Sequence, residues 1–272
     1  MGSLRLLLTD GVALLFTELL FEEGFTKVDA ELDVIYVPTD ELVVEAMLKM
    51  AAVTEHDVLY DLGCGDGRIV VAAAMERGAH AVGIDMDPRR IAEANALAEA
   101  VSVGDRVQFL QDDLLTVDFS EATVVTLYLL PSLNVKLKKR ILSELKPGTR
   151  IIAHAFNMGR WQPDAKRAMG GVYLYKWIVP APMQGTWEWL TSDGKIYRVA
   201  LEQTFQMLSG NAWIDNEQAE LIEAKLLGDR VRLVIQADVR EEPEVFMSSY
   251  QEGVLLPAID SKQVSAGIRL EV

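Results

Sequence analysis

The chain has 272 residues, half of them hydrophobic, which allows one large or two modest domains with a proper core and excludes intrinsic disorder. Its formal net charge of −15 argues against nonspecific binding to nucleic-acid backbones. The charge would favour approach of a cationic partner, or it simply keeps the protein soluble. The single cysteine, Cys64, excludes an intrachain disulfide and a cysteine-rich metal site.

Residues 4–21 are apolar enough to raise the question of a signal peptide or a membrane anchor. Asp10 and Glu18 interrupt the segment, and no small-residue cleavage site follows it. We therefore expect it to pack its apolar side on the protein, with no stable membrane insertion and a cytoplasmic location. A degenerate export or membrane-surface segment is the alternative.

An extended segment, residues 33–37, leads to Pro38. Thr39 is predicted to cap a helix over residues 40–52, because hydroxyl side chains accept from the first free N–H groups of a helix. Acidic residues in the first turn and apolar residues at helical spacing support this helix and give it one buried face.

A glycine-rich loop then connects a short buried strand, residues 58–60, to a helix over residues 68–77. Gly63, Gly65 and Gly67 allow positive φ angles and a close approach of backbone N–H groups to a ligand. A strand, a glycine turn and a helix N-terminus together predict a nucleotide-type binding site.

The neighbours of this loop indicate which ligand it binds. The spacing is G-x-G-x-G rather than the G-x-G-x-x-G of a dinucleotide site. Asp61 enters the loop and Asp66 lies within it, which suits a cationic amino-acid group and ribose hydroxyls better than a pyrophosphate. A second strand, residues 79–84, ends at Asp85, 18 positions after Gly67, where a doubly wound fold places an acid on ribose hydroxyls. These groups predict S-adenosylmethionine as the cofactor and disfavour NAD.

Strands and helices continue to alternate as far as residue 179. This rhythm predicts right-handed βαβ units in a doubly wound, mostly parallel sheet of the Rossmann-like kind, with the binding residues at the carboxyl ends of the strands. The further strands are predicted over residues 106–110, 123–129, 149–155 and 172–179, and the further helices over 88–101 and 132–145.

Beyond the boundary at Pro180-Ala-Pro182 the apolar pattern has period two. Strands are predicted over 186–190, 195–203, 231–237 and 244–247, in a small antiparallel barrel or sandwich with a possible short helix over 217–225. Its tryptophans, Trp187, Trp189 and Trp213, are assigned to the core rather than to a binding face. The predicted division is an apolar segment (1–30), a cofactor-binding domain (31–180) and an all-β domain (181–272).

Three stretches resemble class I S-adenosylmethionine-dependent methyltransferases over roughly residues 31–179. They are similar to the archaeal protein-lysine methyltransferases and the mitochondrial enzymes that modify a lysine of an ATP-synthase subunit. The stretches are Tyr36-Val37-Pro38-Thr39, Asp61-Leu-Gly-Cys-Gly-Asp-Gly-Arg68 and Phe156-Asn-Met-Gly-Arg-Trp-Gln-Pro163.

The resemblance implies roles for further residues. Asp113, rather than Asp112, would accept from the adenine amino group, with Met86 and Leu114 as neighbouring cofactor contacts. Tyr36 would lie near the transferred methyl group, or serve as an ordinary structural contact.

The acceptor side is predicted from the remaining strand ends. Tyr36 and Tyr128 could hold a cationic acceptor by cation–π contact, and Asn157 and Trp161 follow the fifth strand, where Trp161 could instead anchor the loop. The expected activity is methylation of protein lysine amines. The alternatives are a small-molecule methyltransferase whose acceptor is selected by the β domain, and a non-catalytic S-adenosylmethionine-binding protein.

Overall fold

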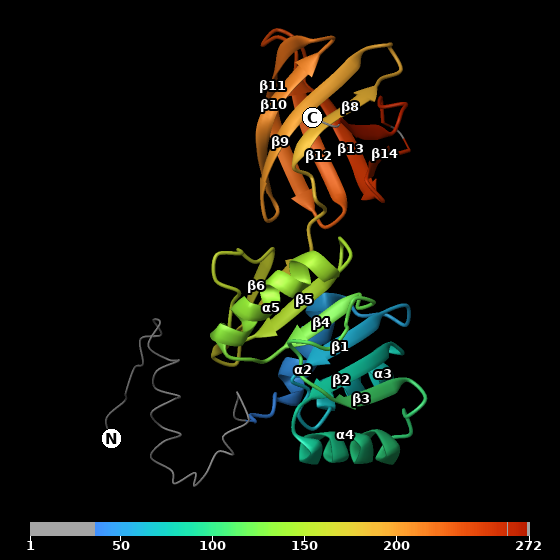
Figure 1. Ribbon diagram of the computed structural model, residues 1–272, viewed down its shortest axis with the longest axis vertical. Helices are drawn as coiled ribbons and strands as arrows, with labels where there is room; N and C mark the ends of the chain where they lie inside the picture. Colours follow the sequence, from blue (N-terminus) through green and yellow to red (C-terminus); the bar gives the residue numbers. More distant parts are fainter. Residues whose placement is uncertain (1–35, 260, 271–272) are drawn as a thin grey trace, which may run out of the picture. The chain divides into compact units, whose positions relative to one another are not determined.

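A computed structural model describes residues 36–259 and 261–270 (Figure 1). The apolar segment predicted over residues 4–21 lies outside the described residues. Within the described part of the chain, every helix is too short or too polar to cross a membrane.

A seven-stranded sheet forms the first part of the fold, in the order β3-β2-β1-β4-β5-β7-β6 (Figure 1). The first five strands in this order, β3, β2, β1, β4 and β5, run parallel, and β7 and β6 continue the sheet in antiparallel pairing. The strands are β1 (Val58–Leu62), β2 (His80–Asp85), β3 (Val107–Gln111), β4 (Val124–Leu127), β5 (Arg150–His154), β6 (Ala165–Met169) and β7 (Val172–Ile178). The helices are α2 (Glu41–Ala51), α3 (Arg68–Arg77), α4 (Pro88–Ala100) and α5 (Pro131–Glu144).

The chain builds this sheet outward from β1 in both directions. It moves from β1 to β2 and β3 through α3 and α4, returns by a loop to β4, and reaches β5 through α5. Because parallel crossovers are right-handed, the reversal places α5 on the opposite face from α3 and α4. The reversal falls between β1 and β4, and open α/β sheets bind their ligands at the carboxyl ends of the strands at such a point.

The predicted doubly wound sheet is confirmed, with two differences in detail. Strand β6 lies in a segment for which we predicted no strand; its side chains are mostly exposed, so the sequence shows no apolar alternation there. The cap of α2 is Asp40, whose carboxylate accepts from the Leu42 N–H at 2.8 Å, and not Thr39. Thr39 is buried and its hydroxyl faces the His154 ring instead.

A closed antiparallel barrel follows, with its strands in the order β10-β11-β12-β13-β14-β15-β8-β9 (Figure 1). Of the two β architectures that the sequence allowed, the barrel is therefore correct. Its strands are β8 (Gly185–Leu190), β9 (Ile196–Thr204), β10 (Met207–Ile214), β11 (Glu217–Leu227), β12 (Arg230–Gln236), β13 (Glu244–Gln251), β14 (Val254–Pro257) and β15 (Gly267–Leu270).

The short helix predicted over residues 217–225 is wrong, because this segment is strand β11. Its Glu, Ala, Lys and Leu residues favour a helix locally, but β11 pairs with both β10 and β12. Trp187 and Trp189 lie in the barrel core as predicted, with 0% and 3% of their surface exposed, whereas Trp213 is half-buried.

Candidate active site

The glycine loop between β1 and α3 adopts the left-handed conformations predicted for it. Gly63, Gly65 and Gly67 have φ angles of 84°, 53° and 78°. A Cβ atom on Gly67 would lie 2.7 Å from Cβ of Ala94 and 2.8 Å from the Phe109 ring, so this position excludes a side chain by space as well as by φ. The result is a backbone cradle at the N-terminus of α3.

Asp85 fixes this cradle from the end of the neighbouring strand. One of its carboxylate oxygens accepts from the Gly65 N–H at 2.9 Å, and the other accepts from the Asp87 N–H at 2.9 Å. Each oxygen keeps acceptor capacity that ribose hydroxyl groups could use. Asp85, the residue predicted to bind the ribose hydroxyls, therefore also holds the glycine loop in place.

Asp61 is a buried acid beneath the loop, with only 2% of its surface exposed. Burial raises its pKa to about 7, and the nearby carboxylates of Asp85 and Asp66 act in the same direction. A hydrogen bond of 2.7 Å from the Thr126 hydroxyl opposes the shift. A cationic ligand group at this place would stabilise the carboxylate, so Asp61 fits the ammonium group of S-adenosylmethionine.

Asp66 is already paired in this structure. The guanidinium of Arg68 donates to it at 2.6 Å through Nη2 and at 3.0 Å through Nε, and Nη1 of Arg68 donates to the Thr39 carbonyl at 2.7 Å. Arg68 thus ties the glycine loop to the segment before α2. Arg68 directly follows Gly67 at the end of the glycine-rich stretch, and this position was the sequence signal that could have identified it.

The remaining predicted cofactor residues lie where β2 and β3 end. Met86 follows β2 and is 41% exposed, while Asp113 and Leu114 follow β3. Asp113 is half-buried and accepts from the Leu115 N–H at 2.8 Å, whereas Asp112 is exposed. We call the carboxyl ends of β1, β2 and β3, with these residues, the cofactor half of the sheet edge.

The acceptor half of the sheet edge comprises the carboxyl ends of β4 and β5 and the loop over residues 156–161. Three aromatic rings meet there. The ring centroid of Tyr128 lies 4.0 Å from that of His154 and 6.5 Å from that of Phe156. Ala155, between the last two, has a φ of 65°, and the Phe156 N–H donates to the His154 carbonyl at 2.8 Å. This tight turn is strained for a residue other than glycine, and it determines the direction of the Phe156 ring.

His154 belongs to this ring cluster, although the sequence did not point to it. The three histidines of the chain, His56, His80 and His154, are scattered and show no ligand spacing. The His154 imidazole is buried, with Nδ1 3.4 Å from the Thr39 hydroxyl. Burial lowers its pKa to about 4, so the ring is neutral at pH 7. Its place as the last residue of β5 was the one signal available in the sequence.

The other predicted acceptor residues differ in exposure. Asn157 is exposed and accepts from the Gly159 N–H at 2.9 Å, whereas Trp161 is fully buried. The burial of Trp161 favours an anchoring role in its loop over direct contact with an acceptor. Tyr36 is 38% exposed in an irregular segment before α2, and its place near the transferred methyl group stays a prediction.

Comparison with known proteins decides the family. Residues 61–165 match the ANTKMT methyltransferase domain. A protein-lysine N-methyltransferase from Saccharolobus islandicus is 47% identical over 129 residues, which cover 47% of this chain and 80% of that protein. The chain belongs to this family of methyltransferases. A lysine N-methyltransferase of an ATP synthase subunit, from Xenopus laevis, is 35% identical over 47% of this chain, which spans only 56% of that relative's length.

A solved structure is similar over a slightly larger share of the chain. The crystal structure of an RNA methyltransferase from Salinibacter ruber, in complex with S-adenosyl-L-homocysteine, is 50% identical and superposes with a TM-score of 0.53. The match covers 54% of this chain and 96% of that chain. About half of this methyltransferase is thus enough to match almost the whole crystallised chain.

The enzyme uses S-adenosylmethionine, whose sulfonium group supplies an electrophilic methyl. Transfer is an in-line displacement, so the chain must align the acceptor with the methyl carbon and exclude water. Asp61, Gly65 and Asp85 form one bonded group at the ends of β1 and β2, and the rings of Tyr128 and Phe156 stack where β4 and β5 end.

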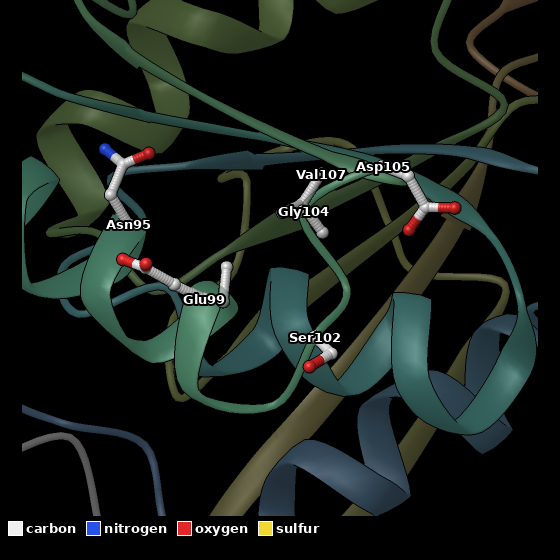
Figure 2. Close-up of a pocket in the computed structure, with 7 residues that line it drawn as sticks. Asn95, Glu99, Ser102, Gly104, Asp105 and Val107 are labelled. Carbon is white, nitrogen blue, oxygen red and sulfur yellow. The ribbon is translucent and has the colours of Figure 1, made fainter.

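Two other features take no part in this assignment. Cys64 packs in the core beside Gly83, and burial raises the pKa of its thiol, which disfavours a nucleophilic role. A pocket of about 550 Å³ lies between the end of α4 and the start of β3, with Glu99 and Asp105 in its lining. Figure 2 labels both residues. The pocket lies at the amino end of β3, which is the opposite edge of the sheet from the cofactor half.

Proposed function

We propose that this methyltransferase transfers methyl groups to lysine side chains of a protein acceptor. The observation that carries the proposal is the ring cluster of Tyr128, His154 and Phe156 in the acceptor half. Aromatic faces attract an ammonium group, and the neutral imidazole of His154 does not repel it. Two relatives that act on protein lysines, at 47% and 35% identity, support the same acceptor class.

The acceptor half also suits the proton loss that a lysine requires before transfer. A free lysine has a pKa of about 10.4 and must become neutral to attack the methyl carbon. Removal of its ammonium group from water lowers that pKa. The half-buried Tyr128 ring beside buried His154 provides such a partly dry surface. In this proposal Tyr36 adds a second ring near the methyl group, and Asn157 contacts the acceptor.

Charge distinguishes this proposal from RNA methylation. The Salinibacter ruber relative is an RNA methyltransferase, but a protein with a net charge of −15 is repelled by a phosphate backbone. The same charge attracts lysine-rich proteins, with an attraction that salt screens. A small-molecule acceptor is the second candidate, in which the barrel would select the acceptor. A cytoplasmic location belongs to the proposal as well.

The acceptor class can be tested with labelled cofactor. Tritiated S-adenosylmethionine is incubated with the enzyme and a cell lysate, which is then separated into protein, RNA and small-molecule fractions. We expect label in the protein fraction, on lysine as identified by mass spectrometry, with incorporation that falls as ionic strength rises. Label confined to the RNA or the small-molecule fraction would overturn the proposal.

Paired substitutions test the ring cluster. Tyr128→Phe keeps the aromatic face and should retain most activity, whereas Tyr128→Ala should lower kcat/KM about tenfold, the effect of losing a contact of roughly 1.4 kcal/mol. The same pair at Tyr36 tests the predicted second ring. Equal activity of the phenylalanine and alanine variants would show that the rings do not bind the acceptor.

A further inference from the structure

The β9–β10 turn of the barrel contacts the acceptor half of the sheet edge. The turn consists of Phe205 and Gln206, between the paired residues Thr204 and Met207. Both turn residues contact Trp161, the buried tryptophan at the end of the loop over residues 156–161. The barrel therefore reaches a loop that directly follows β5.

Gln206 uses both ends of its amide in this contact. Its Oε1 accepts from Nε1 of Trp161 at 3.0 Å, while its Nε2 donates to the Gln162 carbonyl at 2.8 Å and to Oδ1 of Asp164 at 3.3 Å. Nε2 of Gln203 holds the turn by donating to the Phe205 carbonyl at 2.7 Å. Since buried polar groups are costly when left unpaired, this arrangement fixes the indole of Trp161 in one orientation.

Phe205 adds an aromatic contact from a strained backbone position. Its φ is 55°, a left-handed conformation that bulky residues rarely adopt. Its ring stacks on Trp161 with centroids 6.0 Å apart and an interplanar angle of 16°. Nζ of Lys138 lies 5.6 Å from the centroid of the Phe205 ring. Asparagine and glycine adopt this backbone conformation more readily than phenylalanine does. The stacking of the Phe205 ring on Trp161 offsets the cost of this backbone conformation.

Helix α5 holds the same loop at two further points. Nδ2 of Asn134 donates to the Phe156 carbonyl at 3.3 Å, and Nζ of Lys138 donates to the Met158 carbonyl at 3.1 Å. At the start of the loop, the Phe156 ring stacks on Tyr128. One loop thus connects the Tyr128 cluster at its first residue to the barrel turn at its last residue, Trp161.

We propose that Phe205 and Gln206 are positioning residues, through which the barrel orders the acceptor half of the active site. They act on the loop over residues 156–161, and so on the place of Phe156 beside Tyr128. The cofactor half is independent of them, because Asp61, Gly65 and Asp85 bond to residues of the sheet and its loops. The proposal rests on the proposed function only in assigning the acceptor to the side of β4 and β5.

Two pairs of variants in the full chain test this proposal. Gln206→Met keeps the side-chain length and removes the hydrogen bonds, and Gln218→Met makes the same change at an exposed glutamine of β11. Phe205→Asn tolerates the left-handed backbone but removes the ring, whereas Phe205→Tyr keeps it. Each variant is measured for S-adenosyl-L-homocysteine affinity by calorimetry and for hydrogen–deuterium exchange over residues 156–164. Methyl transfer from tritiated cofactor to core histones is measured at low and at saturating histone concentration.

We expect Gln206→Met and Phe205→Asn to speed exchange of the loop about tenfold and to lower kcat/KM for histones about tenfold, with cofactor affinity within twofold. The two control variants should behave as the wild type. Unchanged exchange, or faster exchange without any loss of transfer, would overturn the proposal. If wild-type enzyme leaves histones unlabelled, transfer is measured instead on the lysate fraction that takes the label, and the loss of that transfer in Gln206→Met and Phe205→Asn decides the role of the turn. Whether that fraction is protein, RNA or small molecules decides the proposed function separately.

Discussion

The two halves of the sheet edge take their contacts from different parts of the fold. In the cofactor half, Asp85 bonds to Gly65 of the glycine loop, and Asp61 bonds to a threonine of the neighbouring strand β4. In the acceptor half, Trp161 bonds to Gln206 of the barrel turn. The sheet and its own loops thus hold the cofactor half, whereas the acceptor half depends on both the sheet and the barrel.

This difference bears on a relative that matches only part of the chain. About half of this chain covers 96% of the crystallised Salinibacter ruber chain, which holds S-adenosyl-L-homocysteine. A cofactor half whose contacts stay within the sheet can be shared between a shorter and a longer protein. The barrel can then change the acceptor half, where the barrel makes its contacts.

The largest expected effect tests the cofactor half. Asp85→Ala should weaken S-adenosyl-L-homocysteine binding by about 2–4 kcal/mol, because it removes charge-assisted bonds to ribose and releases the Gly65 loop. Asp105→Ala, which removes the same charge at the amino end of β3, is the matched control and should bind normally. Calorimetry measures both, and equal affinities would contradict the assignment of Asp85. NAD should bind the wild type and both variants more weakly than S-adenosyl-L-homocysteine does.

The shape of the glycine loop gives the next effect. Gly67→Ala should lower the free energy of unfolding by about 1–3 kcal/mol more than Gly194→Ala does, because a Cβ at Gly67 overlaps Ala94 and Phe109. Gly194 has a similar φ of 82° but no atom within 4 Å of the added Cβ, so it measures the backbone strain alone. Denaturant unfolding of both variants separates the steric overlap from the backbone strain. Equal losses in the free energy of unfolding would mean that the loop moves to make room for the added Cβ.

The pH dependence of stability and of ligand binding tests the role of Asp61 in the cofactor half. Because the pKa of Asp61 is raised from 3.8 to about 7, the folded state holds this proton more tightly than the unfolded state does. Stability of the cofactor-free protein should therefore fall as pH rises from about 4 to about 7. Ligand affinity should change the other way, dropping about fivefold from pH 7 to pH 6, since the ammonium group binds the ionised carboxylate. Calorimetry of Asp61→Asn should show neither slope, and a slope equal to that of the wild type would exclude Asp61 as the cause.

The smallest expected effect comes from removing the barrel. A fragment of residues 1–180 should fold and bind S-adenosyl-L-homocysteine within about threefold of the full chain, a change under 1 kcal/mol. The same fragment should lose selectivity or affinity for its acceptor, because Trp161 no longer has Phe205 and Gln206 against it. A soluble, folded fragment that fails to bind the ligand would show that both folds share the cofactor site. It would also contradict the proposed division of domains at residue 180.

The sequence by itself determined the glycine loop and the alternation of strands and helices around it. Glycine spacing, acids after strands and alternating apolar periods are encoded within short windows, where backbone conformation depends on the residues themselves. The helix over residues 68–77 and the left-handed glycines at 63, 65 and 67 are found as predicted. The parallel sheet followed from the alternation of strands and helices, since crossovers have one favoured hand.

Only the tertiary structure decided the features that depend on a distant partner. Residues 217–227 are a strand because β10 and β12 flank them, although their local preference is helical. The pKa of Asp61 follows from burial, and the neutrality of His154 does too. Gln206 belongs to no sequence motif that would single it out. Its contact with Trp161 forms because the folded chain brings the barrel turn to the loop after β5. No local sequence pattern predicts a contact between residues so far apart in the chain.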